Sequence, residues 1–276
     1  MAALGWITSI IQQAAASQKR INEFLKTKTD IISTDNLIEK LVGTIEFKNV
    51  DFQYGEDSEK IVDKLNIKIP CGQKVAIVGK MGSGKSTIAK LLSNSISPTH
   101  GSVLYDGVDI RQLDQEDLLR NVGTMPQEPW LFSGTIRENL QVGYPEYSDE
   151  HLLKIAKIGG VDEFVAQLPE GYDTRLREKG AGLSGGQKQA ISLSRALLHD
   201  PNILILDEPT SSMDQESEKK IVENLNLNAK DKTMIVITHR NALLSICDRV
   251  LVMENGKVIA DNTPEQLGIE KLASSQ

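Results

Sequence analysis

The feature that most constrains this chain is a glycine-rich loop between an apolar run and a helical pattern. Residues 79–87 read GKMGSGKST and fit the pattern G-x-x-x-x-G-K-[ST]. The preceding run, QKVAIVG at 73–79, is short and apolar, as expected for a buried strand. In the STIAKLLSN that follows, Ile88, Leu91 and Leu92 recur at helical spacing. A strand, this loop and a helix in that order predict a phosphate-binding site in an α/β domain.

The residue types within this loop suit the binding of nucleotide phosphates. Glycines at 79, 82 and 84 let backbone N–H groups wrap around phosphate oxygens. Lys85 is expected to place its charge on the β- and γ-phosphates, and the Ser86 hydroxyl to ligate Mg²⁺. ATP and Mg²⁺ are therefore the expected cofactors. The residues of this P-loop that are predicted to bind the nucleotide are Gly79, Lys80, Met81, Gly82, Ser83, Gly84, Lys85, Ser86 and Thr87.

Acidic and imidazole side chains follow two later apolar runs. The run ILILDEP ends in Asp207, which can hold a magnesium shell, and Glu208, which can orient or deprotonate an attacking water. His239 ends a second run in VITHR. The carboxyl ends of parallel strands share one edge of a sheet, so we expect His239 near Gly79 and Asp207, within reach of a γ-phosphate. A lone histidine at a strand end is more often structural, and this shared edge is what favours a functional role.

The order of buried strands and helices predicts an α/β fold, with a mostly parallel sheet flanked by helices and an antiparallel β subdomain. Alternation within GTIEFKNVDFQY also predicts short strands with alternating or bulged faces. The segment RVLVMENGKVIADN, 249–262, is predicted to be a hairpin, because Asn255-Gly256 suits a tight turn. Between about 128 and 198 the pattern is helical, without buried strands, which indicates an inserted helical subdomain. Buried strands are expected at 73–79, 202–209 and 233–239.

The first residues have a different texture from the rest of the chain. The stretch MAALGWITSIIQQAAASQ carries no charge before Lys19. As a helix it would be roughly 27 Å long, whereas a bilayer core is about 30 Å thick. It is also too polar to span a membrane alone, and it lacks the basic start of a signal peptide. We expect residues 1–42 to form a helix and a polar linker, and the chain alone to be soluble or peripheral.

Charge and cysteine content argue against several classes of site. The formal net charge is −7, which disfavours binding by neutralisation of nucleic-acid phosphates, so no nucleic-acid partner is expected. Cys71 and Cys247 lie far apart in no metal-ligand spacing and are expected to be two thiols in a reducing compartment. The four histidines form no cluster in the sequence, so a zinc or iron site is not expected.

A second phosphate cradle raises the question of why one chain would carry two. In EKGAGLSGGQKQA, residues 178–190, Ser184, Gly185 and Gly186 directly precede a helical pattern, and helix N-termini attract anions. The P-loop, LSGGQ and LDEPTSSMD occur in an order that resembles the nucleotide-binding domain of ABC transporters over about residues 43–270. In that family two domains pair head to tail, and each ATP lies between the P-loop of one domain and the LSGGQ of the other. The resemblance therefore implies an ATPase that forms a homodimer.

The same resemblance implies roles for individual residues. Tyr54 in FQYGE matches the aromatic residue that stacks on adenine. Gln127 in TMPQEP matches the glutamine that touches Mg²⁺ and the attacking water and links the core to the helical subdomain. Asp214 in SSMD matches the aspartate that crosses the dimer interface. Glu178 resembles an acidic position just before LSGGQ that contacts the transmembrane partner, although the sequence around it departs from the commoner family pattern. The implied catalytic residues are Glu208, His239, Lys85 and Gln127, the implied metal-binding residues are Ser86, Gln127 and Asp207, and the implied cradle residues are Ser184, Gly185, Gly186 and Gln187.

Two further stretches resemble the exporter branch of the family. LFSGTIRENLQVG, 131–143, is similar to exporters in which the membrane and ATPase domains form one polypeptide. AAASQKRINEFL resembles the end of the last transmembrane helix and the linker after it. The implied organisation is a helix end and linker at 1–42, an ATPase domain at 43–270 with its core at 43–127 and 199–270 and its helical subdomain at 128–198, and a tail at 271–276.

Among exporters, GLSGGQKQAISLSRALLHDPNILILDEPTSSMD most resembles bacterial type I secretion ATPases, which export RTX toxins, adhesins or bacteriocin-like peptides. This implies a site of action at the cytoplasmic face of the bacterial inner membrane. The implied partners are a second ATPase domain, a transmembrane domain of the same exporter, a periplasmic adaptor and an outer-membrane channel.

Four other functions remain as alternatives. Lipid and multidrug exporters share nearly all of these sequence motifs. An importer ATPase subunit, which is a polypeptide separate from its membrane domain, would use the same chemistry. A soluble ABC ATPase acting on nucleic acid or ribosomes would carry long coiled-coil insertions or two ATPase domains, and this chain has neither. A small-molecule kinase with a P-loop would need neither LSGGQ nor Glu208 after Asp207.

Overall fold

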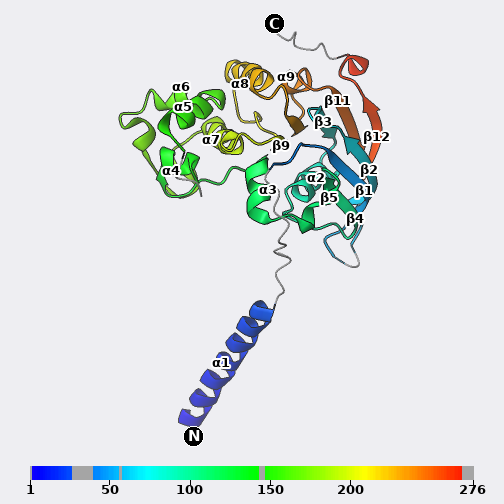
Figure 1. The fold of residues 1–276 in the computed structure, drawn as a ribbon. Helices are drawn as coiled ribbons and strands as arrows, with labels where there is room; N and C mark the ends of the chain where they lie inside the picture. Colours follow the sequence, from blue (N-terminus) through cyan, green and yellow to red (C-terminus); the bar gives the residue numbers. More distant parts are fainter. Residues whose placement is uncertain (1, 27–39, 56–57, 143–146, 269–276) are drawn as a thin grey trace. The chain divides into compact units, whose positions relative to one another are not determined.

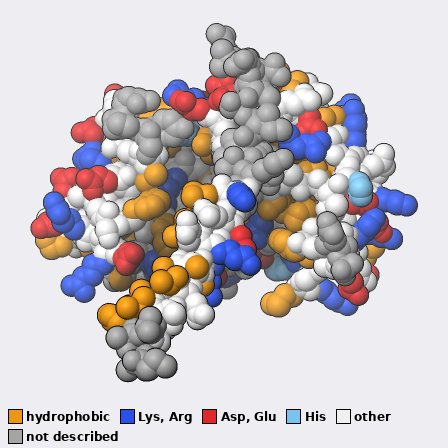
Figure 2. Space-filling model, turned by 90° about the horizontal axis from the view of Figure 1, so that it is seen from below, with side chains coloured by type: hydrophobic (Ala, Val, Ile, Leu, Met, Phe, Trp, Pro, Cys, Tyr) orange, Lys and Arg blue, Asp and Glu red, His pale blue; other side chains and the backbone are white. Residues whose placement is uncertain are grey.

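The computed structural model describes residues 2–26, 40–55, 58–142 and 147–268, so most of the predicted linker and the predicted tail lie outside it. The chain divides into two compact units, Met1–Ser33 and Thr34–Gln276. The first unit contains helix α1 (Ala2–Lys26), as the sequence predicts. Figure 2 shows hydrophobic side chains along this helix, and those most exposed are Trp6, Ile11, Ile21, Phe24 and Leu25. No helix in the described ranges has the length and hydropathy needed to cross a membrane.

A six-stranded sheet forms the centre of the second unit (Figure 1). Neighbouring strands are parallel from β6 to β11, and only β12 runs antiparallel to its neighbour. The mostly parallel sheet expected from the sequence is therefore confirmed. In spatial order its strands are β12 (Lys257–Asn262), β11 (Arg249–Glu254), β3 (Lys74–Gly79), β10 (Thr233–Ile237), β9 (Ile203–Asp207) and β6 (Val122–Met125).

The central strands β9 and β10 are buried at every position, which is why their sequences read as continuous apolar runs. In β9, Ile203 and Ile205 belong to the hydrophobic core on one face of the sheet. Leu204 and Leu206 belong to a second core on the other face. The alternation follows from the two-residue period of a strand. The central strands are therefore covered on both faces of the sheet, and their side chains meet solvent only where the strands end.

A four-stranded antiparallel sheet packs on one face of the central sheet and shares its core with α2 (Lys85–Leu92). The bulges expected in β1 are present, as register shifts between Phe47, Val50 and Phe52. Asn49, between them, has a φ of 48°. The strand order is β2 (Val62–Ile69), β1 (Ile45–Phe52), β4 (His100–Tyr105) and β5 (Val108–Asp109).

A group of helices is inserted between β6 and β9 and lies to one side of the sheets (Figure 1). The expectation of a region without buried strands is not fully met, because β7 (Gly134–Thr135) pairs with β8 (Arg175–Leu176) and Leu176 is buried. Such two-residue pairing has too few positions to give an alternating pattern in the sequence. The inserted helices are α4 (Ile136–Leu140), α5 (Asp149–Ile158), α6 (Val161–Val165) and α7 (Gly185–Leu197).

The remaining helices flank the central sheet or connect its strands. The 3₁₀ turns are short and lie in the connections. The helices are α3 (Gln115–Asn121), α8 (Gln215–Asn228) and α9 (Asn241–Leu244), and the 3₁₀ turns are η1 (Ile110–Gln112), η2 (Gly171–Asp173), η3 (Glu178–Gly180) and η4 (Glu265–Leu267).

Two local expectations from the sequence have clear outcomes. The hairpin at 249–262 is confirmed: β11 pairs with β12, and Asn255 and Gly256 have φ angles of 47° and 76°. His239 does not end a strand as expected, because β10 stops at Ile237, two residues earlier. The Thr238 hydroxyl accepts a hydrogen bond from Arg240 N, 3.0 Å away, so the chain turns locally after Thr238.

Candidate functional site

The P-loop joins the end of β3 to the first residue of α2, and its glycines are required by geometry. Gly84 caps α2 with a φ of 99°, and a Cβ added there would lie 2.7 Å from the Ile61 carbonyl oxygen. A Cβ at Gly79 would lie 2.3 Å from the Met253 carbonyl oxygen. In the part of the chain that the structure describes, no side chain caps the N-terminus of α2. The N–H groups of its first turn are therefore open to an anion.

Two polar side chains of the P-loop are buried inside it. The Lys85 ammonium donates hydrogen bonds to the carbonyl oxygens of Gly79 and Lys80, at 2.6 and 2.8 Å. The Ser83 hydroxyl is buried and has no hydrogen-bond partner within the described residues. The loop thus gathers a cation, a hydroxyl and helix N–H groups, which are the donors that phosphate oxygens need.

The predicted catalytic residues meet the P-loop at the carboxyl edge of the sheet. Since β3, β10 and β9 are adjacent and parallel, their ends place Gly79, His239 and Asp207 at this shared edge, as the sequence predicts. A pocket of about 370 Å³ lies there, within the usual size range of ligand sites. It is lined by Ile61, Met81, Gly82, Gly84, Lys85, Ser86, Thr87, Gln127, Asp207, Glu208, Ile237 and His239.

The donor set around Asp207 fits a magnesium ion. Asp207 is only 5% exposed, and its Oδ1 atom is buried without a hydrogen-bond partner in the described part of the chain. Burial raises the pKa of this carboxyl, against the hydrogen bond of Ser86 and the charge of Lys85. A buried carboxylate oxygen beside a hydroxyl is a hard-oxygen pair of the kind that Mg²⁺ binds. Asp207 and Ser86 would hold the ion, with Gln127 on the same pocket wall.

Glu208 follows Asp207 and adopts a left-handed backbone conformation, with φ at 51°. Its N–H donates to the Ile237 carbonyl oxygen at 2.8 Å, and its Oε1 lies 3.6 Å from His239 Nε2. Burial raises the pKa of Glu208, while the neighbouring His239 lowers it. A partly buried carboxyl with a raised pKa, paired with an imidazole in a pocket, has the properties of a general base.

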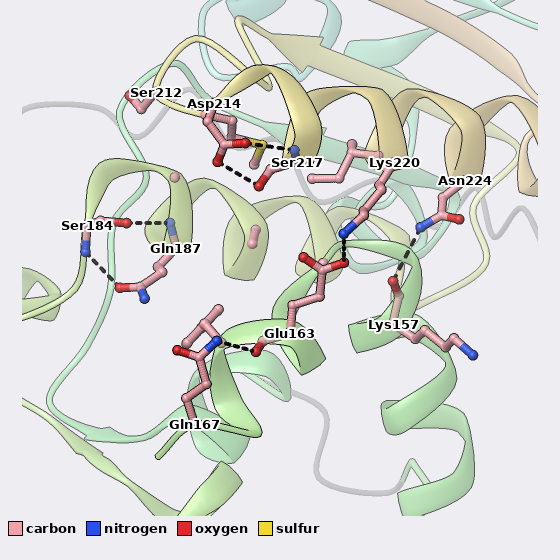
Figure 3. Close-up of a pocket in the computed structure, with 16 residues that line it drawn as sticks. Lys157, Glu163, Gln167, Ser184, Gln187, Ser212, Asp214, Ser217, Lys220 and Asn224 are labelled. Carbon is pink, nitrogen blue, oxygen red and sulfur yellow. Dashed lines mark hydrogen bonds and ion pairs between the residues drawn. The ribbon is translucent and has the colours of Figure 1, made fainter.

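A second pocket lies at the start of α7 and shares no lining residue with the first (Figure 3). Ser184, Gly186 and Gln187 line it from the α7 side, and Ser212 and Asp214 from the segment before α8. Across the pocket, Lys220 Nζ lies 3.2 Å from Glu163 Oε1 and joins α8 to α6. The two phosphate cradles of the sequence are therefore separate sites in the structure.

Hydrogen bonds within the second cradle determine which donors it can offer. Ser184 Oγ accepts from Gln187 N at 3.2 Å, and Gln187 Oε1 accepts from Ser184 N at 2.8 Å, which forms a capping box. The Gln187 side chain is therefore used in the cap. The Ser184 hydroxyl proton and the N–H groups of Gly185 and Gly186 have no intrahelical carbonyl acceptor and are the donors left for an anion. A Cβ at Gly185 would lie 2.8 Å from Ser212 Cβ, so this glycine also permits close packing.

The other predicted site residues lie outside the P-loop pocket or are occupied locally. Tyr54 is 60% exposed, its ring packs edge-on against Phe52, and it does not line that pocket. Lys80 is exposed beside Glu254, at 3.9 Å. Asp214 caps α8, with Oδ1 accepting from the N–H groups of Glu216 and Ser217, and these bonds lower its pKa.

Sequence reasoning missed Gln189, a glutamine on α7 that is only 2% exposed. Its side-chain amide contacts the loop that follows Glu208. A polar residue within the buried stretch QAISLS is a weak signal, because the sequence does not indicate what the side chain bonds to.

A family model described as ABC transporter matches residues 62–211, which is more than half of the chain. This match contains the P-loop, the second cradle and the Asp207-Glu208 pair in one stretch. The chain belongs to the ABC transporter family. It is an ATP-binding domain whose reaction is the hydrolysis of ATP.

Curated relatives and a solved structure place the domain among exporters. It is 41% identical over 262 residues to YgaD of Bacillus subtilis, whose name refers to multidrug export, covering 94% of this chain and 45% of that protein. It is 40% identical over 256 residues to the alpha-hemolysin translocation ATP-binding protein HlyB of Escherichia coli O157:H7, covering 93% and 36%. A bacterial Atm1-family ABC exporter with ATP bound matches with a TM-score of 0.85 and 33% identity, covering 96% and 47%. The chain thus spans less than half the length of these relatives.

Proposed function

We propose that this ATPase domain works as a head-to-tail dimer, in which each ATP is held between the P-loop of one chain and the second cradle of the other. The observation that carries the proposal is the separation of the two pockets, which share no lining residue in one chain. Each pocket offers phosphate donors, but the acidic residues of the second, Glu163 and Asp214, are paired with Lys220 and used in the cap of α8. Asp207 and Glu208 in the first pocket are the acidic residues placed for metal and water. A second copy would bring Ser184, Gly185 and Gly186 to the open side of the bound nucleotide.

Within each site the side chains have distinct roles. Lys85, the α2 N-terminus and the P-loop amides hold the phosphates. Asp207, Ser86 and Gln127 would hold Mg²⁺, which would neutralise phosphate charge. Glu208 accepts a proton from the attacking water, and His239 orients Glu208 and the γ-phosphate. Tyr54 stacks on the adenine, and Asp214 lies at the contact between the chains. The γ-phosphate is bound by the P-loop of one chain and by the second cradle of the other. Its loss on hydrolysis removes this shared ligand and releases the two chains from each other.

The test is the solution mass of the Glu208→Gln chain, measured by light scattering with and without Mg-ATP. This variant should bind ATP and hydrolyse it very slowly, so we expect a shift from one chain to two on adding Mg-ATP. The same protein with Ser184→Ala should not shift. A Glu208→Gln chain that remains single with saturating Mg-ATP would contradict the proposed pairing.

For the whole transporter we propose secretion of a protein or peptide across the bacterial inner membrane, with this domain on the cytoplasmic face. Likeness to the translocation protein HlyB supports it. The segment around Gln127 offers a docking place for a transmembrane partner, because Trp130 and Phe132 are exposed there. The Lys179 ammonium lies over the Trp130 ring, 5.1 Å from its centre, and the Lys179 N–H donates to the Leu131 carbonyl oxygen. Glu178 lies in the same 3₁₀ turn as Lys179 and would contact this partner. A periplasmic adaptor and an outer-membrane channel would complete the pathway.

Likeness to YgaD favours a second candidate, a multidrug exporter. The two candidates differ in what should stimulate the ATPase of the full-length polypeptide in lipid vesicles. We expect an unfolded secreted polypeptide to raise the hydrolysis rate, and amphipathic drugs to leave it unchanged. Stimulation by drugs alone would favour the second candidate.

A further inference from the structure

The loop between β9 and α8, residues 208–214, takes part in both pockets. Its first residue, Glu208, lines the P-loop pocket. Its last residues, Ser212, Met213 and Asp214, line the second pocket, where Figure 3 shows Ser212 and Asp214 facing the start of α7. A displacement of this loop would therefore change both sites of one chain at once.

One buried side chain of α7 holds this loop at three points. Gln189 Nε2 donates to the Glu208 carbonyl oxygen at 3.1 Å and to Ser211 Oγ at 2.8 Å. Gln189 Oε1 accepts from Ser212 N at 2.9 Å. Both donors and the acceptor of the amide are thus used. Because Gln189 is buried, losing it would leave the Ser212 N–H and the Ser211 hydroxyl without these partners, and the Glu208 carbonyl oxygen with only its bond from Ser211 N, at 3.3 Å.

A second set of hydrogen bonds, made by Arg240 and Glu218, holds the same loop. Arg240, next to His239, donates from Nη2 to the Ser211 carbonyl oxygen at 2.9 Å. Arg240 Nη1 lies 3.4 Å from Glu218 Oε2 on α8, and Glu218 Oε1 accepts from the Thr210 hydroxyl at 2.8 Å. The loop is therefore fixed between α7 and the segment that carries His239. Of these two sets of hydrogen bonds, the one made by Gln189 comes from α7, the helix that begins at the second cradle. Gln189 lies five residues after Ser184.

We propose that Gln189 is a positioning residue that sets Glu208 for hydrolysis and couples it to the second cradle on the same helix. The proposal rests on the head-to-tail pairing described above. In that pairing the start of α7 contacts the nucleotide held by the partner chain, whereas Gln189 holds Glu208 at the nucleotide of its own chain. Binding of nucleotide at one site of the dimer then determines the position of Glu208, the base, at the other site.

The geometry at Glu208 explains why this support matters. Glu208 has a φ of 51°, a conformation that a residue with a side chain adopts only when its surroundings impose it. Its N–H is fixed by Ile237, and its carbonyl oxygen accepts from Gln189 Nε2 at 3.1 Å and from Ser211 N at 3.3 Å. Without Gln189 the carbonyl oxygen keeps only the longer bond from Ser211, and Ser211 itself loses the bond that Gln189 makes to its hydroxyl. A displacement of a reacting group by about 1 Å can reduce a rate on the order of 100-fold.

The test compares Gln189→Met with Ser194→Ala in the full 276-residue chain. Methionine keeps the side-chain length but forms none of the three hydrogen bonds. Ser194 is a matched control, since it is buried on the same helix and its hydroxyl has no partner within the described residues. Measured quantities are kcat, KM and the Hill coefficient for Mg-ATP, the ATP affinity of each variant in the Glu208→Gln background, and the melting temperature.

We expect Gln189→Met to lower kcat on the order of 10- to 100-fold, with KM and ATP affinity close to those of the parent chain. Its melting temperature should fall, because buried polar groups lose their partners. The Hill coefficient should exceed 1 in the parent chain and fall to about 1 in this variant. Ser194→Ala should behave like the parent chain in every measurement. A role confined to folding would instead lower the ATP affinity together with kcat.

Three results would overturn the proposal: a Gln189→Met kcat within about twofold of the parent, a loss of kcat matched by an equal loss of ATP affinity, or a Hill coefficient that Gln189→Met leaves unchanged. If Gln189→Met does not fold, Gln189→Glu serves instead, because it retains the acceptor for Ser212 N and removes both donors; parental kcat in that variant would equally overturn the idea. Failure of the dimer model is distinguishable, because it shows in the light-scattering experiment, which leaves Gln189 intact.

Discussion

At the scale of single residues, the adjacent carboxyls Asp207 and Glu208 differ in what surrounds them. Asp207 is buried, and one of its oxygens has no hydrogen-bond partner among the described residues, whereas Glu208 is partly exposed and faces His239. Burial raises the pKa of both. A carboxyl whose folded pKa is raised favours the folded state below its unfolded pKa and loses that contribution as pH rises through the folded pKa. Near neutral pH, these two charges therefore oppose folding in the absence of ligands.

Asp207→Asn should consequently stabilise the nucleotide-free chain. The amide keeps the size of the side chain but carries no charge to bury, and relief of about 1 kcal/mol corresponds to a rise in melting temperature of roughly 2–4 °C for a domain of this size. The same variant should lose Mg²⁺-dependent ATP hydrolysis. Calorimetry at pH 7 and at pH 4 checks the sign, because the difference from the parent chain should shrink at the lower pH. A lower melting temperature at pH 7 would contradict this account of Asp207.

The pH dependence of hydrolysis should report Glu208. A base must be ionised to accept a proton, so kcat should rise with pH through a pKa above the ordinary carboxyl value of 4.5. His239 lowers the pKa of Glu208, and its removal in His239→Ala should therefore move this limb to higher pH. The measurement is kcat against pH for the two proteins. A limb that stays in place or moves to lower pH would remove Glu208 from the role of base.

At the scale of elements, the two phosphate-binding helices begin differently. Helix α2 starts at an uncapped glycine, while α7 starts with a capping box. Ser184 therefore has two functions that a pair of substitutions can separate. Ser184→Ala should destabilise the chain by about 1 kcal/mol, whereas glycine at an N-cap costs only a few tenths.

Both substitutions at Ser184 remove the hydroxyl, so both should abolish ATP-driven pairing of the Glu208→Gln chain. Only Ser184→Ala should also lower the melting temperature, by roughly 2–4 °C. Thermal melts and light scattering on the same samples test this. Pairing retained in Ser184→Gly would mean that the amides of Gly185 and Gly186 suffice to bind the phosphate.

The elements with short-range signals could be predicted from the sequence. The runs that form β3, β9 and β10 are buried on both faces, and the Asn255-Gly256 turn is set by two residues. The β7–β8 pair and the Gln189 bonds could not be predicted, because each depends on a partner far along the chain. Gln189 lies 19 positions from Glu208, and no periodicity links the two. The gathering of Lys85, Asp207, Glu208 and His239 followed from strand order alone, whereas their hydrogen bonds required coordinates.

At the scale of the whole molecule, the ATPase unit binds residues 41–44, near its start, through its own side chains. The Asp106 carboxylate accepts hydrogen bonds from the N–H groups of Val42, Gly43 and Thr44, and Asn202 donates to the Leu41 carbonyl oxygen. These bonds lie entirely within the unit that begins at Thr34. The unit should therefore fold without the segment before it.

Deletion of residues 1–33 should leave the melting temperature within about 2 °C of the parent and kcat unchanged. Calorimetry and steady-state ATP hydrolysis check this. Asp106→Ala is the matched perturbation, since it removes three hydrogen-bond acceptor contacts at the start of the unit and should lower the melting temperature. A deletion that unfolds the domain would show that the first helix supports the ATPase unit.

The separation of the two cradles also has a genetic consequence. In the proposed dimer, a chain defective in Lys85 and a chain defective in Ser184 form a mixed pair. One site of that pair contains both lesions, and the other contains a sound P-loop and a sound second cradle. Two alleles that are each inactive alone should therefore complement each other when expressed together. The same two lesions placed in a single allele, expressed with a wild-type copy, would leave each site of a mixed pair with one lesion, so the phenotype should depend on which chain carries which defect.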